Sequence, residues 1–567
     1  MSTREVVSIQ IGSYSNFVGT HWWNQQESSF VYDPKLLEEH PKEVNHDVLF
    51  REGKTLKGDV TYTPRLVLFD LNNSLGSLKQ DGTLYDVNVE ENIRWVGDVT
   101  LHQTPRTRKN QYLQDLDKES ETLEPRVKQW DDDFDETELC QDSLPLKAEE
   151  QVFGKNYYDL DNDVKVWSDY LRMGLHPRSI FLLKGHQYNN AETPFNIFGL
   201  GQQICKDGQQ WDEIEDRLRY FTEECDQLQG FHILMDSHNA FAGLASSVLS
   251  YLMEEFSNKS RLSFSLTPTT APDQTPAERS ARLLNSALGL YHCSNSSSLY
   301  VPVSLASTLW KSIGKPIDFP HLTYKAQLDY HTSSVIAANL DTVTMPYRTE
   351  ADFGRMNDIT DSLNSMGRKV AALYTTLPFP VRTGTSLIET LTNLTDTRSL
   401  TPHVDCSSTP WIQSCVVRGV PSFVIKSGSH SRPTKQMPTL SSVNDIIQLY
   451  HSEIYPSTLS ASCVLLDGLK VGTPFPHIFQ SEINYQGFLT DTKRPLLSGV
   501  ETVPVMATLQ SNPEVFKYID SLEGCISKFN IARHPHFIEA GLEPDDFTEA
   551  IHSLKDLALC YQDHADL

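Results

Sequence analysis

The sequence contains no stretch of the eighteen or so uncharged apolar residues that a membrane-spanning helix needs. The N-terminus, Met1–Ile11, lacks the basic and then apolar regions of a secretory signal. It is also not rich in arginine and serine, as a mitochondrial presequence would be. We therefore expect neither a transmembrane segment nor a cleaved targeting peptide.

Closely spaced cysteines are missing as well. The nine cysteines are scattered through the chain, and no two of them form a Cys-x-x-Cys pair. His534 and His536 flank a proline, with no second ligand pair at metal spacing. The sequence therefore predicts no metal site, and it predicts reduced, buried thiols in a cytosolic protein.

Positive charge is scarce. Lys and Arg number 48 against 74 Asp and Glu, which gives a formal net charge of −26. Such an excess repels phosphate backbones and anionic lipid surfaces. We therefore expect no nucleic-acid partner and no membrane attachment through a broad basic face.

What the sequence does contain is an alternation of strands and helices. Strands are predicted at Val6–Ile11, Leu66–Asp70, Phe231–Met235 and Leu262–Leu266. Aromatic residues predict a helix around Phe17–Asn24. Between the last two strands, apolar residues recur from Phe241 to Phe256 at three- and four-residue spacing, which is typical of a helix with one buried face. This strand–helix–strand unit predicts parallel strands.

Two regions depart from this alternation. The segment 114–163 is acidic and aperiodic, which predicts a solvated, partly disordered insert, with a partner-docking segment as the alternative. After about residue 345, Ser, Thr and Pro become common. There we expect short strands at Cys415–Arg418 and Cys463–Leu466, a helix at Val443–Tyr450, and two helices from Pro513 onward.

Several motifs, in order along nearly the whole chain, resemble the tubulins. The first, Arg4–Gly19, resembles the first tubulin strand and phosphate loop, and Pro64–Leu71 resembles the second strand, with Asp70 at its end. Further similarities are Cys225–Phe231, Glu254–Phe256 and the last helix from Phe547 to Gln562. The stretch from Gly12 to Asn24 is most similar to the Misato proteins, a family of tubulin relatives implicated in mitochondrial distribution and morphology.

The resemblance implies an α/β, tubulin-like fold. We expect a Rossmann-like parallel-sheet domain in residues 1–300, with the acidic insert inside it. A core helix region (301–345), a smaller α+β domain (346–510) and a C-terminal helical segment (511–567) should follow.

The resemblance also implies where a nucleotide pocket would lie. Its residues here are Gly12, Ser13, Asn16, Asp70, Asn239, Gly243 and Tyr324. Tyr324 would stack on the base, while Ser304 and Asp329 fall near the asparagines with which tubulins read guanine.

This pocket departs from the tubulin pattern. A glycine-rich loop surrounds phosphates with backbone amides, because glycine has no Cβ to clash and adopts positive φ. Here the loop reads Ser237–Gly243 and keeps one glycine, with the bulky Phe241 inside it and the negative Asp236 before it. The acidic pattern that tubulins need for hydrolysis is not found between Ile336 and Asp352. We therefore expect a degenerate pocket, no bound cofactor and no catalytic residue.

The resemblance then implies a non-enzymatic regulator of mitochondrial distribution, morphology and fusion. We expect it in the cytoplasm and peripherally on the mitochondrial outer membrane, with outer-surface proteins as partners. Two alternatives remain open. One is a GTP-binding switch or residual GTPase, and the other is a cytoskeletal factor that contacts tubulin or the cytosolic chaperonin.

Overall fold

The computed structural model describes most of the chain. It covers residues 4–30, 43–54, 60–81, 107–127, 158–190, 194–269, 275–310, 313–351, 354–382, 384–421, 424, 442–495 and 498–562.

A six-stranded, fully parallel sheet forms the N-terminal half. In spatial order its strands are β5 (Ile180–Gln187), β4 (Leu66–Asn72), β1 (Val6–Ile11), β6 (Gly230–Asp236), β7 (Ser260–Leu266) and β8 (Leu299–Val303). The four strands predicted from the sequence are confirmed. Both faces of this sheet are buried, since every residue of β1, β6 and β7 is buried, including the polar residues of β7.

Helices cover both faces of this sheet. Apolar residues of α7 (Gly208–Glu223), α8 (Phe241–Glu255) and α9 (Pro276–Ser296) pack on one face. On the other face lie α1 (Ser13–Glu27) and α10 (Asp329–Val343), which pack against each other. The helix predicted at Phe17–Asn24 is thus the middle of α1, and Trp22 and Trp23 are stacked in the core.

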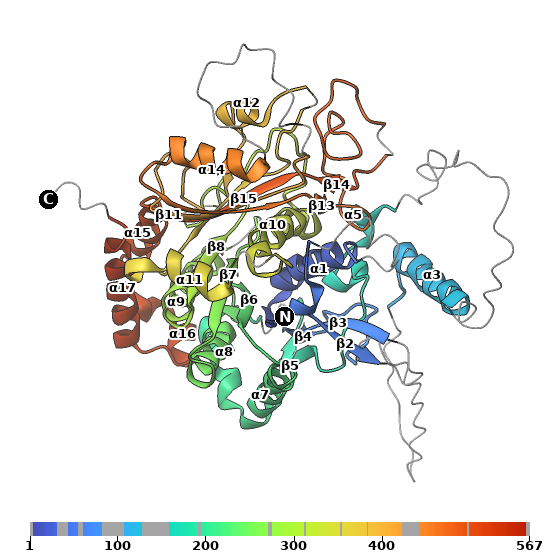
Figure 1. Cartoon of the computed structure of the whole chain (residues 1–567). Coiled ribbons are helices and arrows are strands. Elements are labelled where there is room, and N and C mark those ends of the chain that lie inside the picture. The colour runs from blue at the N-terminus through green and yellow to red at the C-terminus, as the bar shows by residue number, and fades with distance from the viewer. Residues whose placement is uncertain are drawn as a thin grey trace, which may run out of the picture.

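A second, mixed sheet lies on the far side of α10. Its order is β10 (Arg398–Ser399), β9 (Ala372–Thr376), β15 (Val505–Ser511), β11 (Ile412–Arg418) and β12 (Leu459–Leu465), with only β11 and β12 parallel. The outer face packs against α12 (Leu387–Thr392) and α14 (Val443–Ile454). The core helix α10 therefore lies between the two sheets and is buried from Tyr330 to Val343 (Figure 1).

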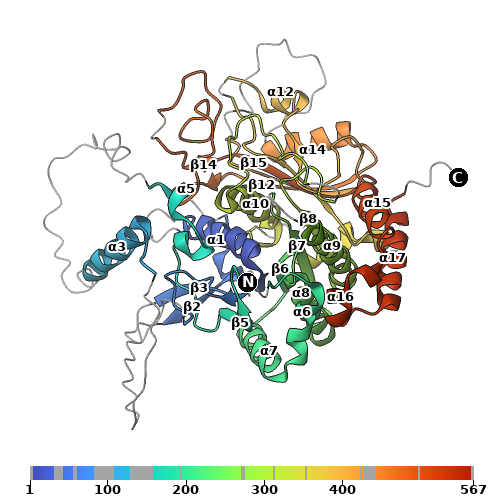
Figure 2. The ribbon, with the colours of Figure 1, turned by 180° about the vertical axis from the view of Figure 1, so that it is seen from behind.

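The C-terminal segment is helical, as expected, but it holds one helix more than predicted. The long helices α15 (Val515–Ile526) and α17 (Pro544–Leu559) pack on α9, and the short α16 (Pro535–Glu539) lies between them in the chain. Figure 2 shows these helices together along one side of the molecule.

The remaining elements are short. They are α6 (Phe198–Gln203), α11 (Met356–Leu363), the antiparallel strand pairs β2 (Phe50–Lys54) with β3 (Val60–Pro64) and β13 (Leu469–Lys470) with β14 (Thr502–Val503), and 3-10 turns at His46–Val48, Trp167–Tyr170, Ile204–Lys206, Met345–Tyr347, Ser365–Gly367 and Ile531–Arg533.

The acidic segment 114–163 differs from the irregular loop that we expected. A helix, α3 (Gln111–Val127), covers its first part, and the short α5 (Leu160–Asp163) covers its end. Among the described side chains of α3, Tyr112 and Leu113 are buried, Tyr112 lies edge-on to Tyr158, and Leu116 packs against the same core. The helical pattern was missed because two of these three apolar residues precede the acidic segment. The centre of the segment, including 131–136, lies outside the described residues.

The eight cysteines in the described ranges are all free thiols. Cys293, Cys415 and Cys463 are buried, as expected. Cys406 and Cys560 are exposed, so the prediction of buried thiols is wrong for these two. Across the same ranges, none of the helices has the length and apolar character to cross a membrane.

Candidate functional site

The carboxyl ends of three strands meet at the N-terminus of α1. Strand β1 ends at Ile11, Gly12 makes the turn, and α1 begins at Ser13. Gly12 has a φ of 117°, and a Cβ at this position would lie 2.4 Å from the Asp236 carboxyl group. Glycine is therefore required here both by the backbone conformation and by the close approach of Asp236.

Asp236, the last residue of β6, occupies the N-terminus of α1. Its carboxylate accepts hydrogen bonds from the backbone amides of Tyr14 (3.3 Å) and Ser15 (2.8 Å), and from the Ser15 hydroxyl (2.7 Å). The amides at a helix N-terminus are the donors that bind phosphates and other anions. Burial raises the pKa of Asp236 to about 7, and these donors only partly oppose that rise.

Asp70 lies beside this turn, in β4. Its carboxylate accepts hydrogen bonds from Ser13 Oγ (2.8 Å), Asn16 Nδ2 (3.0 Å) and the indole Nε1 of Trp167 (2.8 Å). Burial raises its pKa as well, against the effect of these neutral donors. The structure therefore brings together four residues that the sequence predicted for the pocket, namely Gly12, Ser13, Asn16 and Asp70.

The loop before α8 contributes one of its two predicted residues. The Asn239 side chain accepts a hydrogen bond from the Phe241 amide (3.0 Å) and donates one to Asp236 (3.4 Å). Gly243 lies elsewhere, because a Cβ on it would be 1.9 Å from the Phe198 carbonyl oxygen at the contact of α8 with α6. Phe241, expected to obstruct the pocket, packs in the core against Phe195.

The residues expected near a base lie around the start of α10. Tyr324 is half-buried, and its hydroxyl donates to the Ile317 carbonyl (2.7 Å). Ser304 is fully buried and accepts a hydrogen bond from the Ala306 amide, so it cannot contact a ligand. Solvent reaches Asp329, but protein surrounds it on most sides, and this desolvation raises its pKa to about 6.

Tyr14 links the two ends of the site. Its ring is buried, and its hydroxyl donates to Thr332 Oγ1 in the first turn of α10 (3.0 Å). Burial raises the pKa of Tyr14, and the carboxylates of Asp329 and Asp236 raise it further. An aromatic side chain therefore fills the space between the N-termini of α1 and α10.

The electrostatics of the site are negative. Burial raises the pKa of Tyr188 to about 12, and the carboxylates of Asp70, Asp329 and Asp236 add to the increase. Burial and neutral hydrogen-bond donors are the largest influences on the pKa of these aspartates, and none of the three forms an ion pair with a lysine or arginine in the described ranges. Three carboxylates thus share one region without an ion-pair partner among the described residues, and this arrangement opposes the binding of an anion.

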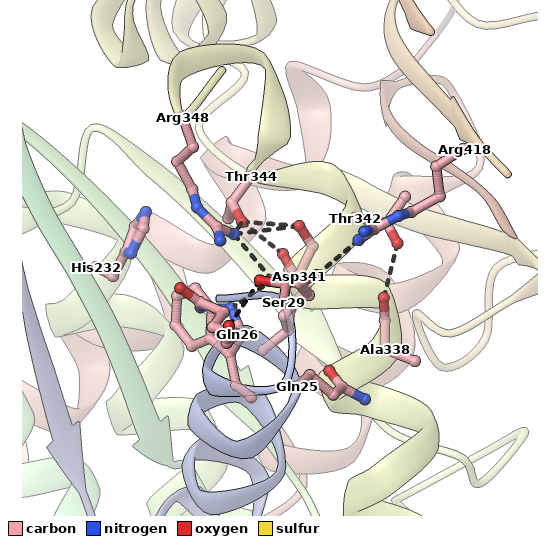
Figure 3. A network of polar contacts seen from close by, with 12 residues as sticks. Gln25, Gln26, Ser29, His232, Ala338, Asp341, Thr342, Thr344, Arg348 and Arg418 are labelled. Carbon is pink, nitrogen blue, oxygen red and sulfur yellow. Dashed lines mark hydrogen bonds and ion pairs between the residues drawn. The ribbon is translucent and has the colours of Figure 1, made fainter. Parts of the chain in front are cut away.

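The opposite end of α10 carries a different arrangement, shown in Figure 3. Asp341 accepts hydrogen bonds from Arg348 (3.0 Å), Arg418 (2.7 Å) and the indole of Trp22 (3.1 Å). Although burial raises the pKa of Asp341, the two guanidinium groups hold it below its ordinary value. The Asp341 side chain is therefore buried and paired within this chain. It cannot act as the acidic residue for hydrolysis at a nucleotide bound to a neighbouring subunit.

The sequence analysis missed several residues that shape the site. Tyr14 and Ser15 were hidden inside the first motif, and Trp167 and Tyr188 come from segments without any motif. Asp236 was recognised only as a negative charge before the loop. A signal for its role was present, because an aspartate that ends a parallel strand faces the helix N-termini at the carboxyl edge of the sheet.

Comparisons with known proteins agree with this geometry. The Misato segment II tubulin-like domain matches residues 4–118, and the tubulin domain matches residues 159–349. Protein misato homolog 1 is 35% identical in Bos taurus, and the alignment covers 99% of this chain and 98% of that protein. The Homo sapiens protein of the same name is 34% identical over the same shares of both chains. Protein misato of Drosophila melanogaster is 29% identical over 99% of each chain. The chain therefore belongs to the Misato family of tubulin-like proteins.

Proposed function

We propose that this protein is a non-enzymatic, tubulin-like regulator of mitochondrial distribution, morphology and fusion that acts from the cytoplasm on the outer mitochondrial surface. Membership of the Misato family supports the mitochondrial role. Fold alone does not determine function, so the non-enzymatic part needs an argument from the site.

One observation carries that argument. The Asp236 carboxylate holds the two amides at the N-terminus of α1 that a phosphate would need. A bound nucleotide would have to displace this carboxylate and then approach Asp70 and Asp329, neither of which is paired with a cation of the described residues. Losing two or three charge-assisted hydrogen bonds at about 1.5–3 kcal/mol each weakens binding by about two to six orders of magnitude.

Isothermal titration with GTP and magnesium tests this proposal. The wild-type protein should show no tight binding, and no hydrolysis above background. A matched pair of variants sharpens the test: Asp236→Ser frees the α1 amides and removes a negative charge, whereas Asp226→Ser removes a charge outside the site. Only Asp236→Ser should gain affinity for GTP. A sub-micromolar affinity of the wild type, abolished by Asp70→Ala, would overturn the proposal and favour a GTP-binding switch.

The location has its own test. Protease added to intact mitochondria should digest the mitochondrial fraction of the protein, because we place it on the outer face. Protection until the outer membrane is ruptured would contradict this placement. Mass spectrometry of the native protein would identify stable partners and test the alternative of a cytoskeletal factor associated with tubulin or the chaperonin.

A further inference from the structure

Strand β12 forms one edge of the second sheet. It pairs in parallel with β11 over seven residues without a register shift, from Ile412 opposite Leu459 to Arg418 opposite Leu465. On its other side no strand of the described chain is paired with it. An edge of this kind presents a row of backbone donors and acceptors.

The register shows which backbone groups point outward. The Leu459 amide donates to the Trp411 carbonyl, so Leu459 faces β11, and so do the alternate residues Ala461, Cys463 and Leu465. The amides and carbonyls of Ser460, Ser462 and Val464 therefore point away from β11. No backbone hydrogen bond to these outward groups is formed by the residues that the structure describes.

The strand also lacks the features that usually protect an edge. Its sequence, LSASCVL, contains no charge, no proline and no glycine, and its pairing has no bulge. Leu459 at its start is 65% exposed, and Leu466 just after its end is 66% exposed. Two exposed leucines thus frame an uncharged strand with free backbone groups.

The charges around the strand decide between occupants. Residues 442–469, which include α14 and β12, contain Asp445, Glu453 and Asp467 but no lysine or arginine. Arg418 of β11 donates to the Asp467 carbonyl, but it is buried and its charge is paired with Asp341. The Glu43 carboxylate adds to the C-terminal end, where it accepts the amides of Leu466 and Asp467, both at 2.9 Å. A second copy paired antiparallel would bring the Asp467 end against the Glu453 end, so like charges would meet.

We propose that β12 is a docking strand for an extended segment of a partner protein that carries lysine or arginine at its ends. The segment adds a sixth strand to the second sheet and pairs with the outward groups of Ser460, Ser462 and Val464. Its apolar side chains cover Leu459 and Leu466, and its terminal cations face the acidic residues at both ends of β12. Main-chain bonds supply the affinity in this mode of recognition, and the flanking charges supply the selection.

Fluorescence anisotropy of labelled peptides with the full-length protein tests the proposal. The peptide KTVTVTK should bind saturably, and its counterpart ETVTVTE should bind at least about tenfold more weakly because its ends meet like charges. Ser462→Pro removes one outward amide without touching the ladder to β11, and Ser462→Ala is the matched control that keeps the amide. Ser462→Pro should lose most of the binding, whereas Ser462→Ala should bind like the wild type.

Hydrogen exchange of the wild type keeps the test decisive if Ser462→Pro fails to fold. Bound KTVTVTK should slow exchange at the amides of Ser460, Ser462 and Val464. The amides of Ala461 and Cys463, already bonded to β11, should not change. Equal binding of both peptides, no binding at all, or uniform protection would overturn the proposal. A protein dimer that protects the same alternate amides without peptide would show that the occupant is a second copy instead.

Discussion

Two buried carboxylate sites lie along the same pair of packed helices and differ in what surrounds them. At the N-terminus of α1, the hydrogen bonds that described residues donate to Asp236 and Asp70 come from backbone amides, hydroxyls, the side-chain amides of Asn16 and Asn239, and an indole. Near the C-terminus of α10, Asp341 receives two guanidinium groups besides an indole.

The difference appears in the pKa values. Burial raises the pKa of Asp236 to about 7, because neutral donors do not offset the loss of water. At Asp341 burial acts in the same direction, yet Arg348 and Arg418 bring the pKa below its ordinary value. Of the two sites, only the one with cations keeps the carboxylate pKa below its ordinary value. At the α1 site, burial makes the charged form of the carboxylate less stable than it is in water.

The largest expected effect is at the compensated site. Asp341→Asn leaves two guanidinium groups buried without a counter-charge, so we expect a loss of about 3–5 kcal/mol in the free energy of unfolding. Urea denaturation measures it, and Asp520→Asn, at an exposed carboxylate, is the control with little effect. A loss below about 1 kcal/mol would mean that the ion pairs contribute no more than surface pairs do.

Gly12→Ala should give the next largest loss in the free energy of unfolding, about 3 kcal/mol. A positive φ costs an L residue about 1–2 kcal/mol, and the new Cβ meets Asp236. The control is Gly208→Ala at the start of α7, where a Cβ meets nothing within 4 Å. Thermal unfolding of both variants compares them. Equal stability of the two would show that Asp236 moves away without cost.

A pair of tryptophans compares the sites directly, since each indole donates to one of the carboxylates. Trp167→Phe should lower the free energy of unfolding by about 1.5–3 kcal/mol, because it removes one hydrogen-bond donor from Asp70. Trp22→Phe removes the same volume, but Asp341 keeps both arginines, so its loss should be smaller. The reverse order in denaturant unfolding would contradict the comparison.

The pH dependence should be the smallest effect. In the folded protein the pKa of Asp236 is about 7, above the 3.8 of an aspartate in water, so this group's contribution to stability is full below pH 3.8 and is lost as the pH rises through 7. From about pH 6 to about pH 8, wild type should lose about 1.4 kcal/mol relative to Asp236→Asn. At Asp341 the sign is opposite, because a lowered pKa gives stability that is lost as the pH falls. An unchanged difference between wild type and Asp236→Asn across this range would show that Asp236 does not titrate there.

The sequence predicted the parts of the fold that have strong local patterns. The strands at Val6–Ile11 and Phe231–Met235 and the helix from Phe241 carry their own periodicity, so each was found. Helix α3 was missed because Tyr112 and Leu113, two of its described core residues, precede the acidic segment. Asp70 and Asn16 were found through the family motif, but Tyr14, Trp167 and Tyr188 reach the site through tertiary contacts that no local pattern encodes.

The Asp341 network also has a mechanical consequence. One carboxylate joins the core helix to Trp22 of α1 and to Arg418 at the end of β11, and so connects both sheets. If α10 slid by one helical turn, about 5.4 Å, Arg418 would be separated from its counter-charge inside a dry interior. Hinge motion between the halves of the molecule that contain the first and the second sheet is therefore blocked at Asp341. Both halves should open together in a single cooperative step, with the amides of α10 among the last to exchange with solvent.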